Sequence, residues 1–302
     1  MNSKNKTIPQ LGLVFTTFAW GATFVLVKEA LNDAQPFIFA FYRFLLAAII
    51  VIPFALFRNK KIFQEIHELE LKGGILCGIF LYLGYSFQNY GLGITTPSKS
   101  AFITSMSILL VPFFVYFIKN RKISFHLWIS IVIAIIGLYL LLNPSNVIIT
   151  EKGYSYESMI ANLGDFFTFG CAIFFAVHII FQGDYVLKKI NIVRFFIIQC
   201  FSVSILSFFS ALILGEYKVT WTLQLVNAIL ITGIIATSLA IFIMVWAQKK
   251  LSPSETAIIF SMEPVFASLF SILLGVEFFS FMQWCGAFTV VFAVIYYSMV
   301  SD

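Results

Sequence analysis

The sequence predicts an all-α polytopic membrane protein with ten transmembrane helices, arranged as two inverted five-helix repeats. Three observations predict this fold class: the composition is apolar, positive charges alternate between successive loops, and part of the chain repeats at a fixed offset. Of the 302 residues, 60% are hydrophobic and only 11% are charged, whereas roughly a quarter of a soluble chain is charged. The mean hydropathy is +0.96. Because so few polar residues cannot cover a water-soluble core of this size, most of the surface must face lipid.

The ten helices follow from the lengths of the apolar runs. A bilayer core of about 30 Å needs about 20 predominantly apolar residues in a helix. Ten runs meet this requirement: 9–28, 36–57, 71–93, 97–118, 124–143, 160–182, 192–214, 223–247, 254–274 and 280–299. The longest segment between them, residues 144–159, is predicted to be an extracytoplasmic linker between a first repeat (1–143) and a second repeat (160–302).

The positive charges predict the orientation. Lys and Arg in short loops mark the cytoplasmic side of a membrane protein. Fourteen of them lie in the N-terminus and in every second loop after it, four lie in the other loops, and the nineteenth, Arg43, lies within the second run. Both termini are therefore predicted to be cytoplasmic. The net charge of +5 then reflects topology, and no nucleic-acid partner is expected.

The internal repeat appears when the chain is shifted by 156 residues, which aligns residues 96–101 (TPSKSA) with residues 252–257 (SPSETA). At the same offset, Ser105 aligns with Ser261 and Trp128 with Trp284. Each unit contains five helices, an odd number, so the second unit enters the membrane from the opposite side. Many secondary transporters have this arrangement, with a substrate site near the midplane between the halves. The repeat itself is equally compatible with a channel.

Two charged side chains lie deep in the predicted helices. Arg43 is about seven residues into the second run, and Glu263 is about nine residues into the ninth. A charge in lipid costs at least about 2.5 kcal/mol on insertion scales, so both should face a cavity or a partner. Pro264 follows Glu263 and should interrupt the helix there, because proline lacks a backbone donor. The sequence leaves two alternatives open, a structural ion pair between Arg43 and Glu263 or a role in binding and coupling.

Other polar and aromatic side chains in the runs are further candidates for substrate binding, each with packing as the alternative. With Arg43 and Glu263, the complete candidate set adds Trp20, Tyr82, Tyr85, Gln88, Asn89, Ser105, His178 and Trp246. Asp165 is interpreted as a helix-start residue. The four cysteines are far apart in apolar stretches, so neither a disulfide framework nor a metal site is expected. No nucleophile, phosphate-loop or metalloprotease motif is present, so we expect no cofactor and no enzyme activity, and a membrane-embedded enzyme is the weaker alternative.

At this point the residues resemble the EamA-type members of the drug/metabolite transporter superfamily. The resemblance covers nearly the whole chain. It is carried by residues 19–21 (AWG), 42–45 (YRFL), 88–92 (QNYGL), 95–102 (TTPSKSAF) and 262–267 (MEPVFA). One departure is Arg121, where the family often has an acidic residue, whereas the equivalent position in the second half is Glu277.

The resemblance implies a central cavity and alternating access. We expect the first, third, fourth, sixth, eighth and ninth helices to line the cavity, with the fifth and tenth as supports. The expected function is a secondary transporter, an exporter of small organic metabolites such as amino acids, in a bacterial inner (plasma) membrane. A channel for small solutes is the alternative. Expected partners are a small-molecule substrate, membrane lipid, and a coupling proton or counter-substrate, and the chain is expected to be a monomer.

Overall fold

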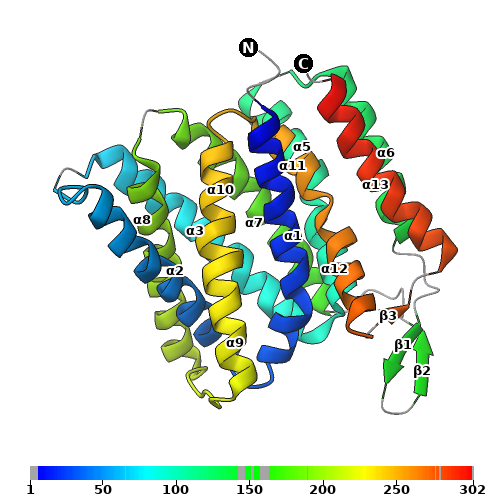
Figure 1. Ribbon diagram of the computed structural model, residues 1–302, viewed down its shortest axis with the longest axis horizontal. Coiled ribbons are helices and arrows are strands. Elements are labelled where there is room, and N and C mark those ends of the chain that lie inside the picture. Colours follow the sequence, from blue (N-terminus) through cyan, green and yellow to red (C-terminus); the bar gives the residue numbers. More distant parts are fainter. Residues whose placement is uncertain are drawn as a thin grey trace.

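A computed structural model describes residues 6–64, 66–120, 122–141, 147–150, 153–156, 163–188, 190–275, 277–278 and 280–300. Each of the ten predicted runs coincides with a helix or a series of helices (Figure 1). The first half contains α1 (Thr7–Ala30), α2 (Pro36–Arg58), α3 (Glu68–Ile94), α4 (Pro97–Ser105), α5 (Ser107–Lys119) and α6 (Phe125–Leu141). The second contains α7 (Leu163–Val186), α8 (Ile192–Leu214), α9 (Leu223–Ile231), the π-helix η2 (Thr232–Leu239), α10 (Ala240–Ala247), α11 (Pro253–Phe260), α12 (Glu263–Leu273) and α13 (Phe281–Val300).

Local sequence signals explain many helix ends. Pro36, Pro97 and Pro253 are the first residues of α2, α4 and α11, where the missing backbone N–H costs nothing. Gly215 ends α8 in the left-handed conformation that glycine favours. Eight of the helical runs are long and apolar enough to cross a membrane, and α6 is a shorter apolar helix. The third run, α3, has 27 residues and is long enough to span, although it is more polar than the others.

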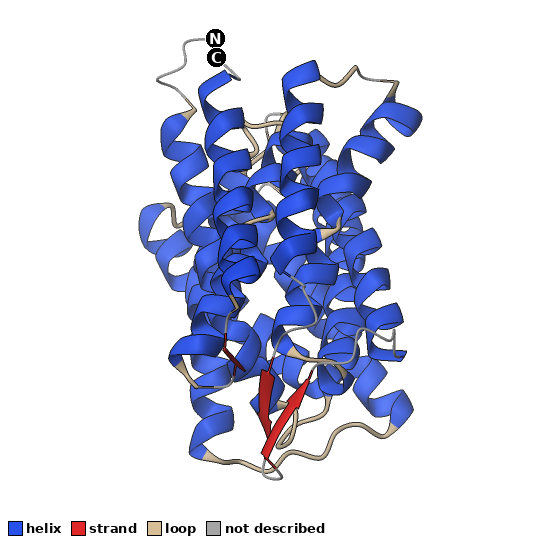
Figure 2. Ribbon diagram, turned by 90° about the vertical axis from the view of Figure 1, so that its right-hand side faces the viewer, coloured by secondary structure: helices blue, strands red, loops and turns tan. Residues whose placement is uncertain are grey.

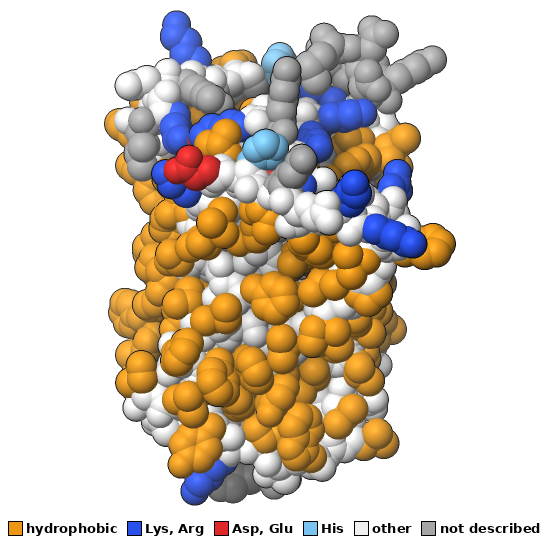
Figure 3. Space-filling model, turned by 90° about the vertical axis from the view of Figure 1, so that its left-hand side faces the viewer, with side chains coloured by type: hydrophobic (Ala, Val, Ile, Leu, Met, Phe, Trp, Pro, Cys, Tyr) orange, Lys and Arg blue, Asp and Glu red, His pale blue; other side chains and the backbone are white. Residues whose placement is uncertain are grey.

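The surface matches a membrane-embedded molecule. Figure 3 shows a broad belt of hydrophobic side chains, with Lys and Arg gathered mainly at one end. Figure 1 shows that α1 begins and α13 ends at this same end, which we call the terminal end. Large apolar side chains such as Phe57 and Ile213 are 90% and 81% exposed. So many exposed apolar side chains are favourable in contact with lipid and unfavourable in contact with water.

Three of the membrane runs are interrupted. The fourth breaks at Met106, between α4 and α5, and the ninth breaks at Ser261 and Met262, between α11 and α12. The ninth breaks where Pro264 predicts it. The fourth carries no proline at the equivalent position, Ile108, so its break follows only from the structure. The eighth run widens into η2, and π-helical turns of this kind occur frequently at functional sites.

The all-α expectation needs one correction. Three short strands, β1 (Val147–Thr150), β2 (Gly153–Tyr156) and β3 (Glu277–Phe278), form an antiparallel sheet in the order β2-β1-β3. They lie toward the end opposite the terminal end, which we call the distal end (Figure 2). The predicted linker is therefore partly a hairpin, because Val147–Thr150 is a β-branched run that favours strand. The rest of the linker, like Arg121 in the loop predicted to be cytoplasmic, lies outside the described residues.

Helices of the first half pack mainly against helices of the second. The α3 helix packs against α7 and α8, whereas η2 and α10 pack against α1 and η2 also against α2. The α6 and α13 helices pack against one another at one edge (Figure 1). A Cβ atom added at Gly286 would lie 2.6 Å from the carbonyl oxygen of Gly137, so this close contact needs glycine.

Candidate functional site

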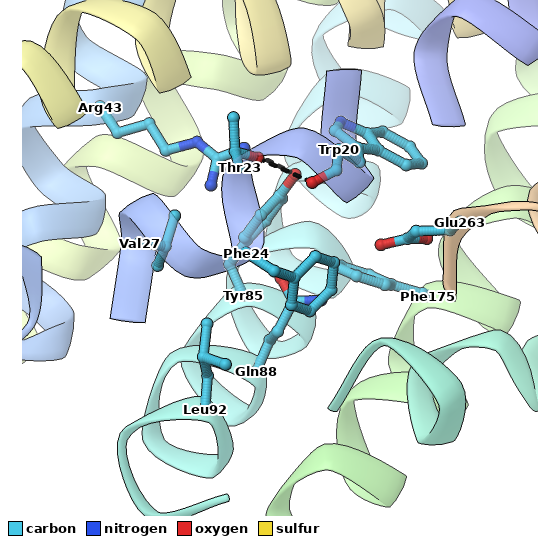
Figure 4. A pocket seen from close by; sticks show the side chains of 10 residues that line it. All are labelled: Trp20, Thr23, Phe24, Val27, Arg43, Tyr85, Gln88, Leu92, Phe175 and Glu263. Carbon is cyan, nitrogen blue, oxygen red and sulfur yellow. Dashed lines mark hydrogen bonds between the residues drawn. The ribbon is translucent and has the colours of Figure 1, made fainter. Parts of the chain in front are cut away.

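Two adjoining cavities of about 20 Å³ each lie between the halves. Trp20, Tyr85, Phe175 and Glu263 line both of them (Figure 4). The first cavity is also lined by Thr23, Phe24, Val27, Arg43, Gln88 and Leu92. The second is also lined by Leu81, Thr104, Ser107, His178, Ile179, Ile241, Met244 and Phe260.

The lining comes from the six runs that the sequence predicts, the first, third, fourth, sixth, eighth and ninth, and Arg43 adds the second run. No described residue of α6 or α13 lines either cavity. The two ionisable side chains deepest in the predicted runs are closed from solvent, because Arg43 is 3% exposed and Glu263 is 5% exposed. The structure is therefore one in which this central site is occluded.

Arg43 is held on one side of the first cavity by three hydrogen bonds. Its Nε donates to Thr237 Oγ1 at 2.7 Å, and its Nη2 donates to Tyr85 Oη at 3.1 Å and to the Ala236 carbonyl at 3.4 Å. The guanidinium also lies 4.4 Å from the centre of the Tyr85 ring, a cation–π distance. Its Nη1 donates to no described residue, so this nitrogen is left for a cavity ligand.

The π-helix supplies the acceptors for these bonds. Ala236 and Thr237 both belong to η2, and the Ala236 carbonyl also accepts from Trp20 Nε1 at 2.8 Å. A π-turn leaves carbonyl groups out of the regular ladder, so one carbonyl can receive side chains from α1 and α2. The ring of Trp20 then forms a wall of both cavities, edge to face with Phe260 at 4.9 Å.

Glu263 is the first residue of α12, immediately after the break in the ninth run. Within the described part of the chain its carboxylate has no hydrogen bond and no ion pair with protein, although it lines both cavities. Among its described contacts Arg43 bonds Thr237, Tyr85 and Ala236 and not Glu263, so the two side chains do not form an ion pair in this structure. Figure 4 shows the two side chains apart, with the rings of Trp20, Tyr85 and Phe175 between them.

Ser107 occupies the equivalent place in the first half. It is the first residue of α5, directly after the break in the fourth run, and it precedes Glu263 by the repeat offset of 156. Both side chains line the second cavity. The two interrupted helices therefore meet the same central space at equivalent positions, with a carboxylate on one side and a hydroxyl on the other.

The remaining polar lining is amide and imidazole. Gln88 Nε2 donates to Thr104 Oγ1 at 3.4 Å, and His178 Nε2 lies 3.3 Å from Gln199 Oε1. Gln199 Nε2 is buried without a partner among the described residues. These groups make the cavity wall polar at a few points and aromatic elsewhere, the pattern of a small-molecule site.

Four of the predicted binding residues lie outside the lining. Tyr82 shares a 2.6 Å hydrogen bond with Ser210, and Ser105 donates to the Phe102 carbonyl. Asn89 is 1% exposed and donates to the Pro36 carbonyl. Trp246 packs against the apolar cluster that includes Leu13 and Met244. All four make packing or structural contacts, so we leave them out of the proposed site.

Sequence reasoning missed Phe175, which lines both cavities, because one phenylalanine among 37 carries no signal of its own. It also missed the partner of Asp165. This residue lies in the first turn of α7 as predicted, and it forms a 2.7 Å ion pair with Lys99. Among the described residues, no group of three or more His, Cys, Asp or Glu side chains could hold a metal ion.

The family model for the EamA-like transporter family matches the chain twice, over residues 7–143 and 162–299. An uncharacterized transporter of Archaeoglobus fulgidus is 32% identical over 96% of this chain and 85% of its own. The uncharacterized inner membrane transporter YedA of Escherichia coli is 23% identical over 95% and 90%. An S-adenosylmethionine uptake transporter of Rickettsia prowazekii is 29% identical over 39% of this chain and 42% of its own.

A solved crystal structure with 17% sequence identity has the same fold, with a TM-score of 0.76 over 98% of both chains. The two family matches together take in both halves and every residue that lines the two cavities. The membrane-spanning helices, the central cavities and these matches agree with one another. The chain is a membrane transporter, and it belongs to the EamA-like transporter family.

Proposed function

We propose that this chain is a secondary transporter that exports small organic metabolites such as amino acids across the inner membrane by alternating access. The observation that carries the proposal is the unpartnered carboxylate of Glu263 in an occluded, aromatic cavity. A buried charge without a protein partner is costly. A ligand or a coupling proton that enters the cavity would remove this cost.

The walls favour an organic cation beside Glu263. Trp20, Tyr85 and Phe175 surround the space in front of the carboxylate (Figure 4). Aromatic faces attract ammonium groups, and a carboxylate accepts charge-assisted hydrogen bonds from them. Glu263 is therefore suited to the amino group of a substrate.

Arg43 supplies the complementary charge. Its fork is fixed by Thr237, Tyr85 and Ala236, and Nη1 remains for a substrate carboxylate, which arginine recognises well. A molecule with an ammonium at one end and a carboxylate at the other matches these two charges. That chemistry is the α-amino-acid zwitterion, whose apolar side chain would lie toward the largely apolar second cavity once the halves move apart to admit it.

Alternating access draws support from the equivalence of the two halves. The family model matches each half once. The contacts between the halves are also symmetric: the third run, α3, packs against the first two runs of the second half, α7 and α8, and the equivalent eighth run, η2–α10, packs against the first two runs of the first half, α1 and α2. An inverted repeat with two such halves can rock around a central site. The inner membrane location and the cytoplasmic termini remain predictions, supported by the cations at the terminal end (Figure 3).

The test is solute movement by purified protein in proteoliposomes loaded with single L-amino acids. We expect saturable flux, and exchange of labelled internal substrate for external substrate. Glu263→Gln should abolish most of the flux, whereas Glu29→Gln, at an exposed glutamate that bonds Gln224, should not. Flux that does not saturate and shows no exchange would instead identify a channel, and absence of flux for every amino acid would overturn the substrate class.

A further inference from the structure

Two ion pairs join the halves at opposite ends of the molecule. Lys6 Nζ lies 2.9 Å from Glu255 Oε1, and Lys99 Nζ lies 2.7 Å from Asp165 Oδ2. The first is at the terminal end, where α1 and α11 begin, and the second is at the distal end, where α4 and α7 begin. We propose that these pairs are equivalent gates, one at each end of the central cavity, which break in turn during transport. The inference rests on the proposed function only for the transport cycle, not for the geometry.

The two gates are built on the same local structure. Glu255 and Lys99 are 156 residues apart and are each the third residue of a helix that begins with proline, after a capping Ser252 or Thr96. Their partners lie in similar places, because Lys6 directly precedes α1, the first helix of one half, and Asp165 is in the first turn of α7, the first helix of the other, one helical turn from the position that aligns with Lys6. The signs of the charges are reversed between the two gates. The helix that begins with proline carries the anion, Glu255, at one end and the cation, Lys99, at the other.

Each gate stands at the same sequence separation from the cavity. Glu255 is eight residues before Glu263, and Lys99 is eight residues before Ser107, with one helix break in each segment. Glu263 and Ser107 both line the second cavity. The two pairs therefore lie at opposite ends of the central space, at matching sequence positions.

The charge on α4 needs a compensating partner. A cation in the first turn of a helix opposes the helix dipole, whereas an anion there is favoured. Glu255 agrees with the dipole and also accepts from the Ser252 backbone N–H at 2.7 Å, but Lys99 opposes it. Asp165 compensates, and its other oxygen accepts from Thr95 Oγ1 at 2.8 Å.

Burial makes these pairs suited to switching. The side chains of Lys99 and Asp165 are 9% and 8% exposed, and those of Lys6 and Glu255 are 20% and 9% exposed. Removing one partner by mutation would leave the other as an unpaired buried charge, which is destabilising. Opening the end of the molecule instead lets water solvate both charges at once, and an ion pair that is exposed to water contributes little net stability. An ion pair of this kind stabilises the closed end without preventing it from opening.

Both ends hold further contacts between the halves beside the proposed gates. At the terminal end Arg194 and Glu70 form a second ion pair between the halves, at 2.6 Å, and Lys119 and Asp184 form a third. At the distal end Tyr90 donates to Glu216, and Gln224 donates to Glu29. Loss of one gate should therefore loosen its end while these contacts remain.

The experiment measures the width of each end in lipid nanodiscs by electron–electron distance measurements on the full chain. Spin labels at exposed Ile94 and Leu163 report on the distal end, and labels at exposed Ile8 and Lys250 report on the terminal end. The four native cysteines, of which three are buried, are replaced by alanine. Distances are measured without substrate.

Lys99→Glu should lengthen the 94–163 distance and leave the 8–250 distance unchanged, and Glu255→Lys should do the reverse. Lys99→Glu combined with Asp165→Lys restores opposite charges and should restore the closed distance. Lys218→Glu, an equal charge change at an exposed site on the distal side, is the matched control and should change neither.

A folded Lys99→Glu variant with an unchanged 94–163 distance would overturn the proposal, as would lengthening at both ends by either single variant. Should Lys99→Glu fail to fold, Lys99→Gln with Asp165→Asn removes both charges and must still shift the 94–163 population toward longer distances. The distances are measured without substrate, so they test the gates independently of transport. If the distances respond to the variants but the protein moves no solute, the proposed function is refuted and the gates remain supported. Unchanged distances with intact flux refute the gates alone.

Discussion

Trp20 and Arg43, on two different helices, donate hydrogen bonds to the same backbone oxygen, the carbonyl of Ala236. One π-helical carbonyl thereby fixes an aromatic wall and the guanidinium of the central cavity together. The site depends on a distortion of the eighth membrane run, so local changes in η2 should disturb two lining residues at once.

Glu263→Gln is expected to reduce the apparent affinity for an amino-acid substrate about ten- to hundredfold, because one charge-assisted hydrogen bond of about 1.5–3 kcal/mol is lost. The melting temperature should stay the same or rise, since the amide removes an unpartnered buried charge. Substrate titrations in proteoliposomes and thermal unfolding measure the two effects. A large fall in melting temperature with unchanged flux would make Glu263 a structural residue.

Glu263→Gln combined with Arg43→Gln should not restore flux or stability, because the two side chains do not pair. A buried ion pair would give a coupling free energy of about 0.5–3 kcal/mol, and we expect a smaller value because the two side chains share the cavity without contact. A thermal-unfolding cycle of the two single variants and the double variant measures the coupling. Restored flux in the double variant would show an ion pair in another conformation of the transporter.

Tyr85→Phe should lower both stability and flux, since it removes a hydroxyl that accepts from Arg43. We expect a loss of about 1–2 kcal/mol for a hydrogen bond of this kind in a membrane protein. Tyr82→Phe is the matched control on the same helix, because its hydroxyl bonds Ser210 outside the cavities. Equal loss of flux in both variants, after correction for the amount of folded protein, would contradict a role for Tyr85 at the site.

Arg43→Lys should be milder than Arg43→Ala but not silent, because lysine keeps the charge and lacks the fork that reaches Thr237, Tyr85 and Ala236 together. Melting temperature and substrate affinity should fall in the order wild type, Lys, Ala. Identical behaviour of Lys and wild type in both measurements would show that the fixed fork is not needed.

Glu70 should make the stability depend on acid pH. Its burial raises the pKa, but hydrogen bonds from the Arg194 side chain and the Asn191 backbone outweigh this, and the pKa of Glu70 lies below its ordinary value of 4.5. The folded pKa is depressed, so the stabilisation is present above about pH 4.5 and is lost as the pH falls through the folded pKa. Melting temperatures of wild type and Glu70→Gln should converge as the pH is lowered below 4.5, and parallel curves would contradict this role.

Both termini are expected to be cytoplasmic, because the cations outside the membrane runs favour the terminal end. Tags at either end should be inaccessible in intact cells and accessible after permeabilisation. External labelling of one tag would refute the helix count as well as the orientation.

The sequence by itself determined the ten helical runs, the shared position of the termini and five of the charged or polar lining residues. The lengths of the apolar runs, the alternation of cations between loops and the 156-residue offset are properties of the sequence itself. They can therefore be found by counting residues, without coordinates. The proline after Glu263 likewise announced the break in the ninth run. These features depend on the lipid solvent and on backbone chemistry, which are the same in every packing arrangement.

Only the tertiary structure decided which polar groups meet. Arg43 bonds the π-helix and not Glu263, because residues at similar depth on different helices can face different directions, and depth is all that a one-dimensional sequence supplies. The break at Met106, the lining role of Phe175 and the Lys99–Asp165 pair also depend on helix rotation and on contacts between the halves. Those contacts are set by side-chain packing between segments far apart in the chain, which no local pattern records.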